Sequence, residues 1–179
     1  AKLVRAGAPA LGVELAISPD DEVLARSNVV LKSYWDNAEA TEDALEGGWF
    51  HTGDCGYLDD EGYLAISDRK KDVIITGGEN VSSIEIEDAL FSHPAVAEVA
   101  VIGVPSDKCG ETPIALVVLA PGASATEEEL QDWCRGRLAR FKCPSTVEFV
   151  ESLARTATGK LQKFKLRAPY WEGRERQVN

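Results

Sequence analysis

The stretch "SDRKKDVIITGGENVSSIEIEDAL", residues 67–90, changes character within a few positions and decides the kind of fold. A charged run leads into the apolar run "DVIIT" at residues 72–76, which is followed by two adjacent glycines. β-branched residues bounded by turn formers predict a short strand. Gly-Gly permits backbone conformations that are closed to other residues. The sequence therefore predicts a strand that ends in a tight turn.

A helix is predicted directly after this turn. Ser82 and Glu85 have the spacing of a capping box, in which a hydroxyl and a carboxylate satisfy the first amides of a helix. Pro94 prevents the helix from continuing. Between them, apolar positions recur at helical spacing: Ile86, Ala89, Leu90 and His93. We expect a helix of about ten residues.

Three further strands are predicted downstream. Residues 95–104 and 113–120 are continuous apolar runs, which suit strands that are buried on both faces. Residues 146–151, "TVEFVE", are expected to form another strand.

A second capping box, formed by Thr126 and Glu129, precedes a helical stripe that Pro144 closes. The stripe consists of Leu130, Trp133, Cys134, Arg137 and Leu138. Residues 163–171 suggest a short terminal helix. The order after residue 67 is then β-α-β-β-α-β-α, which is an α+β unit.

The region before Ser67 has a different texture. It consists of short β segments joined by turns, at residues 12–17, 22–27, 29–35 and 62–66. We therefore divide the chain into a β-rich piece, residues 1–67, and a compact α+β domain, residues 68–179.

Composition excludes several classes of protein. The 179 residues are 44% hydrophobic and 27% charged, as in ordinary globular proteins. No apolar run approaches the ~20 residues that cross a bilayer. Four cysteines without a CxxC pair, and only two histidines, argue against a zinc site or a disulfide framework. Reduced thiols fit a cytoplasmic protein.

Charge is unevenly distributed along the chain. The net charge of −11 argues against nonspecific binding to nucleic acid or to anionic membranes. Residues 1–132 carry a net −18, with 8 basic and 26 acidic residues, whereas residues 133–179 carry a net +7 from 11 basic and 4 acidic residues. The basic section could serve a small anionic ligand such as a nucleotide, or it could be a solvated surface.

Three stretches are rich in Gly, Thr, Lys and Asp: "HTGD" at 51–54, the stretch at 67–87, and "ARTATGKLQK" at 154–163. Each has a plain structural explanation when it is taken alone: a turn aspartate, a charged hairpin and a solvated loop lysine. "TGK" is not a Walker phosphate loop, because Ala154 stands where that motif needs glycine and Leu161 where it needs a hydroxyl.

The combination is more specific than its parts. "GWFHTGDCGYLDDEGYLAISDRKKDVIITGGENVSSIEIEDAL", "HPAVAEVAVIGVPSDKCGETPIALVVL" and "RTATGKLQK", in this order, resemble the carboxy-terminal region of acyl-adenylate-forming enzymes. That superfamily includes acyl-CoA synthetases, peptide-synthetase adenylation domains and firefly luciferase. The resemblance implies a small mobile C-terminal domain with a mixed sheet and flanking helices, preceded by the end of a large N-terminal domain.

The resemblance also implies a reaction. A carboxylic acid is joined to AMP from ATP, and the acyl group then passes to a thiol, usually that of CoA. Mg²⁺ would arrive with ATP, and its ligands would lie outside this chain. The motifs look closest to short- and medium-chain fatty-acyl-CoA synthetases. The expected partners are the acid, ATP, CoA and the large N-terminal domain.

Site residues follow from the motif positions. Asp54 looks like the carboxylate that binds the ribose hydroxyls of ATP, and Arg69 like a nearby contact to the ribose or phosphate. Asp68 looks like the hinge between the two domains. Lys160 is similar to the lysine that bridges the carboxylate and the α-phosphate during adenylation. After rotation at the hinge, the turn Gly77-Gly78-Glu79 would line the channel for the pantetheine thiol.

Two departures from the family pattern qualify this interpretation. Ala154 precedes Arg155 where the family usually has proline. Nothing in residues 1–66 resembles the phosphate loop or the aromatic-Thr-Glu segment of the large domain, so we expect the last third of an enzyme that is inactive by itself. Two alternatives stay open: a non-catalytic interaction module that keeps the small-domain fold, and an adenylation enzyme with a carrier-protein acceptor.

Overall fold

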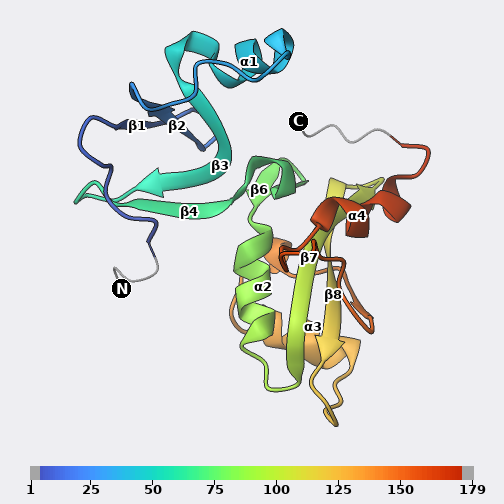
Figure 1. Cartoon of the computed structure of the whole chain (residues 1–179). Coiled ribbons are helices and arrows are strands. Elements are labelled where there is room, and N and C mark those ends of the chain that lie inside the picture. The colour runs from blue at the N-terminus through green and yellow to red at the C-terminus, as the bar shows by residue number, and fades with distance from the viewer. Residues whose placement is uncertain (1–4, 175–179) are drawn as a thin grey trace. The chain divides into compact units, whose positions relative to one another are not determined.

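The computed structural model describes residues 5–174 and separates into two compact units, the first ending at Lys70 and the second beginning at Lys71. Each unit is built around its own β-sheet, as Figure 1 shows. The chain is α+β, as the sequence predicts. The domain boundary proposed from the sequence, between residues 67 and 68, falls inside the last strand of the first unit.

Unit 1 is an antiparallel meander. Its strands pair in the order β1 (Glu14–Ile17), β2 (Glu22–Arg26), β3 (Phe50–Leu58) and β4 (Leu64–Arg69). Three of the four β segments predicted for this region, those that became β1, β2 and β4, form strands close to their predicted positions. The segment before β4 turns tightly, so that β3 and β4 form a hairpin.

The prediction of a strand at residues 29–35 is wrong. This segment is a loop whose one β-bridge joins Tyr34 to Asn37. The side chains of Val29 and Trp35 are 79% and 97% exposed. β-branched and aromatic residues favour a strand only where neighbouring side chains pack against them, and within residues 5–174 these two have little to pack against.

A short helix that the sequence analysis did not predict follows this loop. It is α1 (Ala38–Ala44), and a 3₁₀ turn, η2 (Glu46–Gly48), leads from it into β3. The Asn37 side chain accepts a hydrogen bond from the Ala40 amide at 3.0 Å, which caps the helix. None of the residues of α1 is buried, so its sequence has no apolar stripe from which the helix could be predicted.

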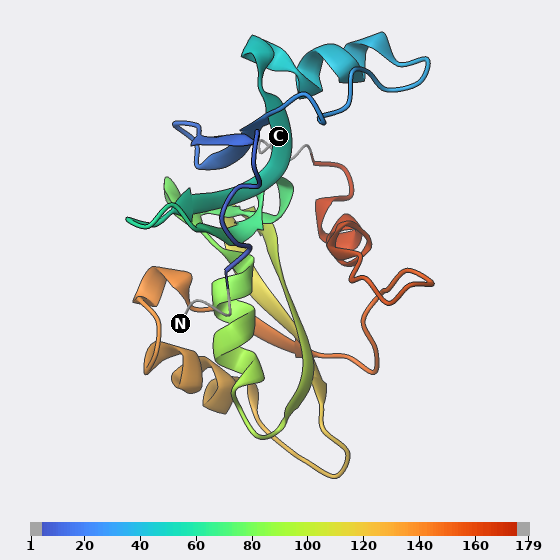
Figure 2. The same ribbon diagram turned by 60° about the vertical axis from the view of Figure 1, so that its left-hand side comes forward.

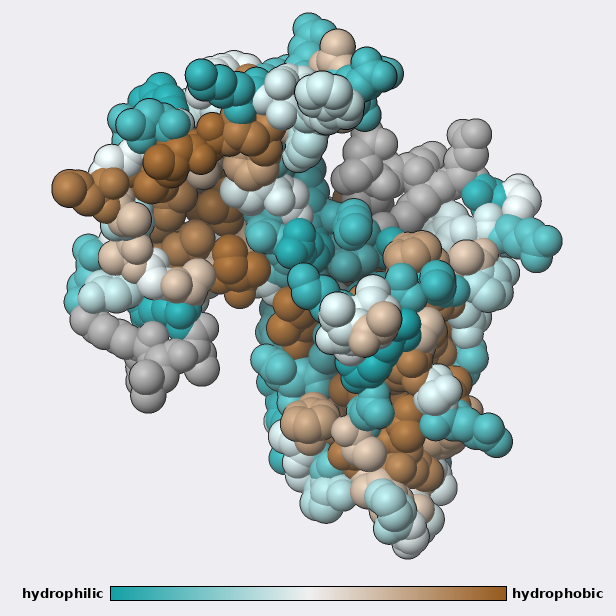
Figure 3. Space-filling model, viewed as in Figure 1, coloured by the Kyte–Doolittle hydropathy of each residue, from teal (hydrophilic) through white to brown (hydrophobic). Residues whose placement is uncertain are grey.

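Unit 1 leaves much apolar surface uncovered. Among the described residues of this unit, only Val23 and Cys55 are buried hydrophobic side chains. Leu11, like Val29 and Trp35, is almost fully exposed, and Figure 3 shows apolar residues gathered over the surface of this unit. A patch of this kind is typical of a surface that packs against more protein.

Unit 2 contains a mixed sheet. Its strands are β5 (Ile74–Thr76), β6 (Glu79–Val81), β7 (Val96–Ser106), β8 (Gly110–Leu119) and β9 (Thr146–Phe149). They pair in the order β6-β5-β8-β7, all antiparallel, and β9 pairs with β8 in parallel. Only β6 was not predicted from the sequence.

The three helices predicted for this region are present: α2 (Ser83–Phe91), α3 (Glu127–Arg135) and α4 (Lys163–Arg167), which continues into η5 (Ala168–Trp171). Two 3₁₀ turns were not predicted: η3 (Lys70–Asp72, which begins one residue before the unit) and η4 (Arg140–Lys142). The helix predicted to run to Leu138 ends at Arg135, because Gly136 caps it. Leu138 still packs against the core from outside the helix.

Both predicted helix caps accept a backbone hydrogen bond, and the full capping box is seen at the second helix. Ser82 Oγ accepts a hydrogen bond from the Glu85 amide at 3.3 Å. At the second helix the capping box is complete, since Thr126 Oγ1 accepts from the Glu129 amide and the Glu129 carboxylate accepts from the Thr126 amide. The carboxylate of Glu85 binds Lys142 Nζ at 2.6 Å.

The two faces of the unit 2 sheet are covered by different segments. Helices α2 and α3 cover one face, and the chain around α4 and η5 covers the other, as Figure 2 shows. Alternate residues of β8 point to opposite sides: Ala115 and Val117 toward α2 and α3, Ile114 and Leu116 toward Leu161 and Leu166. This division separates the segments that carry the candidate functional residues.

Truncation of the buried isoleucine of α2 should destabilise unit 2. Ile86 is fully buried, so Ile86→Ala should lower the free energy of unfolding by about 2–5 kcal/mol. Ile84 lies in the same helix but is 38% exposed, so Ile84→Ala is a matched control and should cost less than half as much. Urea unfolding measures both, and equal losses would contradict this packing.

Candidate functional site

Asp54 lies in a distorted part of β3. His51 pairs with Leu24, and Cys55 pairs with Glu22, so residues 52–54 span a single residue of β2. Such a bulge re-aims side chains. Gly53 has φ of +71°, a conformation that side chains other than glycine rarely adopt. The glycine before Asp54 is therefore required by the backbone.

The bulge brings Asp54 and Arg69 together. They are cross-strand partners of β3 and β4, and Arg69 Nε lies 2.8 Å from Asp54 Oδ1. The side chain of Asp54 is 28% exposed and that of Arg69 is 58% exposed. Both groups therefore remain accessible to a small polar molecule.

Asp68 is placed differently from these two residues. It lies opposite Cys55 near the end of β4 and is only 1% exposed. Its Oδ1 accepts a hydrogen bond from the Arg69 amide at 2.7 Å. A buried carboxylate at this position holds the backbone immediately before the boundary between the two units.

Glu22, which no sequence motif marks, lies beneath the bulge with its side chain 3% exposed. Gly53 N–H donates to its Oε1 at 2.9 Å, and Lys70 Nζ lies 2.9 Å from its Oε2. His51 Nδ1 lies 3.0 Å from the same oxygen and acts as the donor, because an ionised carboxylate only accepts. Burial would raise the pKa of Glu22, but the hydrogen bonds from these three donors outweigh it and lower the pKa.

Lys70 extends this network to the surface. Its Nζ also lies 2.8 Å from Asp20, and the hydrogen bonds to Asp20 and Glu22 raise the pKa of Lys70 to about 12. The same interaction lowers the pKa of Asp20 to about 2. In the sequence, Glu22 opens an ordinary strand segment, so only its burial in the fold distinguishes it from other acidic residues.

The predicted diglycine turn is the loop of the β5–β6 hairpin. Thr76 pairs with Glu79, so Gly77 and Gly78 are the two loop residues. Their φ angles are +60° and +89°. Positive φ at both central positions is what a type I′ hairpin turn requires, and two glycines adopt it without strain. The Gly77 amide donates to the Cys109 carbonyl at 2.9 Å, which fixes the turn on the neighbouring hairpin.

Lys160 lies in an ordered loop between β9 and α4. The Thr156 amide donates to the Lys160 carbonyl at 2.8 Å, and the Lys160 amide donates to Thr156 Oγ1 at 3.0 Å. Arg155 braces the loop from the other side by donating to the Gly159 carbonyl and binding Glu98 at 2.6 Å. The loop is therefore closed even though Ala154 replaces the proline of the family pattern.

Two largely buried ion pairs anchor the helix after this loop. Lys163 Nζ lies 2.6 Å from Glu87 and donates to Ser83 Oγ at 2.7 Å. Arg167 binds Asp72 at 3.3 Å. Breaking a buried pair costs several kcal/mol, so these contacts fix the loop on unit 2.

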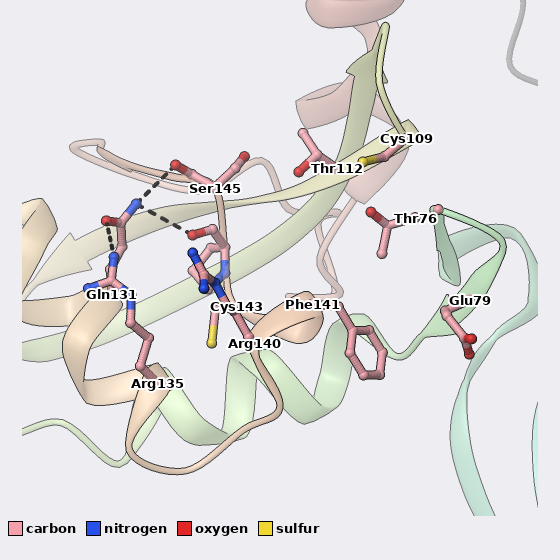
Figure 4. Close-up of a pocket in the computed structure, with 12 residues that line it drawn as sticks. Thr76, Glu79, Cys109, Thr112, Gln131, Arg135, Arg140, Phe141, Cys143 and Ser145 are labelled. Atoms are coloured by element: carbon pink, nitrogen blue, oxygen red, sulfur yellow. Dashed lines mark hydrogen bonds between the residues drawn. The ribbon is translucent and has the colours of Figure 1, made fainter.

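A pocket of about 590 Å³ lies beside the diglycine turn, as Figure 4 shows. Gly77 and Glu79 contribute from the hairpin, and Arg140 and Phe141 contribute from η4. Arg135 adds a second guanidinium from the end of α3. Cationic and aromatic side chains around one hollow suit a ligand with phosphate groups and a flat ring. Arg140 and Phe141 were not predicted from the sequence as site residues.

Within unit 1 the structure thus brings Asp54 and Arg69 into contact, whereas Asp68 is buried opposite Cys55. Within unit 2 it places the diglycine turn and Lys160 in different surroundings. The turn borders the pocket formed with α3 and η4, whereas Leu161, next to Lys160, packs on the opposite face of the sheet.

Comparisons with known proteins identify relatives of this chain. A family described as "AMP-binding enzyme C-terminal domain" matches residues 85–160. A long-chain-fatty-acid–CoA ligase of Mycobacterium tuberculosis is 46% identical over 174 residues, which is 92% of this chain and 34% of that protein.

Two solved structures are also similar. The ATP-bound MatB structure from Rhodopseudomonas palustris has a TM-score of 0.87 and 36% identity, over 93% of this chain and 36% of that chain. The o-succinylbenzoate CoA synthetase of Bacillus subtilis, in complex with its acyl-adenylate intermediate, has a TM-score of 0.84 and 40% identity over 92% of this chain and 36% of that one.

The chain belongs to the acyl-adenylate-forming enzymes. It spans about a third of the length of the relatives it matches, and it corresponds to their C-terminal part. Its relatives include CoA ligases that act on different acids. Among residues 5–174, no helix is long and apolar enough to cross a membrane.

The Glu22 network should make the stability of unit 1 depend on pH. The folded pKa of Glu22 lies below its ordinary value of 4.5, so its contribution is fully present above that value and is lost as the pH falls through the folded pKa. Glu22→Gln should therefore destabilise the protein near neutral pH and much less in strong acid, where the wild-type carboxyl is also neutral. His51 and Lys70 face this carboxyl, Asp20 binds Lys70, and all three stay unchanged in the variant.

Urea unfolding at a series of pH values measures this difference. Glu14→Gln is the control, because Glu14 pairs with Arg26 on the same sheet but is largely exposed. A Glu22→Gln deficit that is the same at neutral and acid pH would show that the carboxylate charge is not what stabilises the fold.

Proposed function

We propose that the full-length protein that contains this chain is an AMP-forming acyl-CoA ligase, which activates a carboxylic acid with ATP and transfers the acyl group to CoA. The observation that carries the proposal is that the Lys160 loop and the diglycine turn lie in separate surroundings on one sheet, while unit 1 offers the accessible Asp54–Arg69 pair. We also propose that the large N-terminal domain ends at residue 67 and that the small mobile domain begins at residue 68.

Each candidate residue has a chemical role in this proposal. The carboxylate of Asp54 accepts hydrogen bonds from both ribose hydroxyls, and Arg69, whose Nε lies 2.8 Å from Asp54 Oδ1, holds it in place. The ammonium of Lys160 stabilises negative charge that develops between the carboxylate and the α-phosphate. Within residues 5–174 Lys160 has no carboxylate partner, so its charge is available.

The second half-reaction uses the diglycine turn of unit 2 and the pocket beside it. Rotation about a hinge at Asp68 would withdraw Lys160 and present Gly77, Gly78 and Glu79 to the same centre. The absence of side chains at the two glycines leaves room for the narrow pantetheine arm. The adjacent pocket, with Arg140 and Phe141, has the charge and the aromatic surface that the nucleotide end of CoA needs.

Further chain and a metal ion complete the proposal. The uncovered apolar surface of unit 1 supports a role as the edge of a large N-terminal domain, which would supply the acyl pocket and the remaining ATP contacts. Mg²⁺ would be bound with ATP by that domain. The cysteines of the chain are free thiols, which suits the cytoplasm.

We propose that the acid is a short- or medium-chain fatty acid, because the motifs of this chain look closest to those of synthetases for such acids. The relatives named above act on a long-chain fatty acid and on succinylbenzoate, so the acyl class needs a direct test. The full-length protein should release pyrophosphate with ATP and a fatty acid from a panel of acids, and form a thioester when CoA is added. A carrier-protein acceptor would appear as acyl-adenylate formation without reaction with CoA, and an interaction module would form no adenylate with any acid.

Removal of the Lys160 ammonium should separate the two half-reactions. Lys160→Ala in the full-length protein should slow acyl-adenylate formation about 100-fold or more, because one preorganised charge at a transition state is worth that much. Thioester formation from acyl-adenylate supplied in advance should change only a few-fold. Lys165→Ala, an exposed lysine on α4, is the control. Equal losses in both half-reactions would contradict the assignment of Lys160.

Removal of the Arg140 charge should affect only the CoA step. A charge-assisted hydrogen bond is worth about 1.5–3 kcal/mol, so Arg140→Ala should raise KM for CoA about tenfold or more. Adenylation measured without CoA should be unchanged. Arg174→Ala removes an equal charge outside the pocket and serves as the control. An unchanged KM for CoA in Arg140→Ala would argue against this pocket as the nucleotide site.

A further inference from the structure

Glu22 is a buried carboxylate that joins two parts of the candidate site. One oxygen receives the amide of Gly53, the residue directly before Asp54. The other lies 2.9 Å from the ammonium of Lys70, the last residue of unit 1. Its exposed fraction is 3%, whereas Asp54 above it is 28% exposed. Glu22 is thus hidden from a ligand that Asp54 could reach.

We propose that Glu22 is a positioning residue that holds the bulge carrying Asp54, and the end of β4 carrying Asp68 and Arg69, in the geometry that binds the nucleotide sugar. The inference rests on the proposed function insofar as that function assigns Asp54 to the ribose. It adds a residue that acts through the backbone and does not touch the nucleotide.

The geometry favours positioning over general support of the sheet. The bond from Gly53 is made at the bulge, where β2 and β3 no longer pair in regular register. In that gap the carboxylate replaces a backbone acceptor, and the left-handed conformation of Gly53 directs its amide toward Glu22. Thr52 completes the same turn, since its hydroxyl donates to the Val23 carbonyl at 2.7 Å.

The group must be a carboxylate to satisfy all three donors. A glutamine of the same size offers one acceptor oxygen, and its amide nitrogen would face Lys70 or His51, which also donate. Methionine is similar in length and offers no strong acceptor. The series Glu, Gln, Met therefore removes the network in steps with little change in volume.

The experiment uses the full-length protein with Glu22→Gln and Glu22→Met. We expect KM for ATP in adenylation to rise about threefold in the first and about tenfold in the second, while KM for the acid and for CoA stays within twofold. Hydrogen exchange of the segment that contains residues 51–55 should accelerate in Glu22→Met. Glu14→Gln and Glu14→Met, on the exposed pair with Arg26, should change neither readout.

The outcomes separate this inference from the proposed function. If the wild-type protein forms no acyl-adenylate, the proposed function fails, and the exchange of residues 51–55 still decides whether Glu22 holds the bulge. Unchanged exchange in both variants would overturn the inference, as would equal increases in KM for ATP, acid and CoA. If Glu22→Met does not fold, Glu22→Gln carries the test through the selective change in KM for ATP.

Discussion

Strand β8 is the physical constraint on which unit 2 depends, because its two faces are both apolar and both covered. Ala115 and Val117 pack under α2 and α3, and Ile114 and Leu116 pack under the chain around α4. A strand buried on both sides fixes the register of its neighbours, because a slip by one residue would exchange the two sets of side chains. Because of this alternation, the diglycine turn borders the pocket on one side of the sheet, and the Lys160 loop packs through Leu161 on the other.

Local chemistry explains why most of unit 2 could be predicted from the sequence. Thr126 and Glu129 form the expected cap because a capping box needs only residues close in sequence. β7 and β8 come from continuous apolar runs that lack the polar–apolar alternation of a half-exposed strand, so the sequence predicts that both are buried. β6 was missed because a strand of three residues, with exposed Glu79 and Asn80, carries no apolar pattern of its own.

What could not be predicted depends on contacts between distant residues. Glu22 is 31 positions from Gly53 and 48 from Lys70, and no local motif marks it. The loop at residues 29–35 contains strand-forming residues, but within residues 5–174 it pairs with no strand. The motifs did place Asp54 and Arg69, but only the cross-strand register shows that they form an ion pair. Motifs thus predicted which residues belong to the candidate site, whereas the distances and partners of their side chains depend on contacts between distant residues.

The basic section of the chain shows why net charge alone is a weak signal of ligand binding. Six of the ten cations among residues 133–174 pair with carboxylates: Arg135 with Asp132, Lys142 with Glu85, Arg155 with Glu98, Lys163 with Glu87, Arg167 with Asp72 and Arg174 with Asp107. Across the part of the chain that the structure describes, four cations of this section have no carboxylate partner: Arg137 and Lys165, which lie over the rings of Trp133 and Phe164, and Lys160 and Arg140. Lys160 lies in the ordered loop after β9 and Arg140 borders the pocket beside the diglycine turn. A cation that the fold exposes and does not neutralise remains free to meet an anionic group, and it is these two residues, rather than the sum of charges, that the proposed function uses.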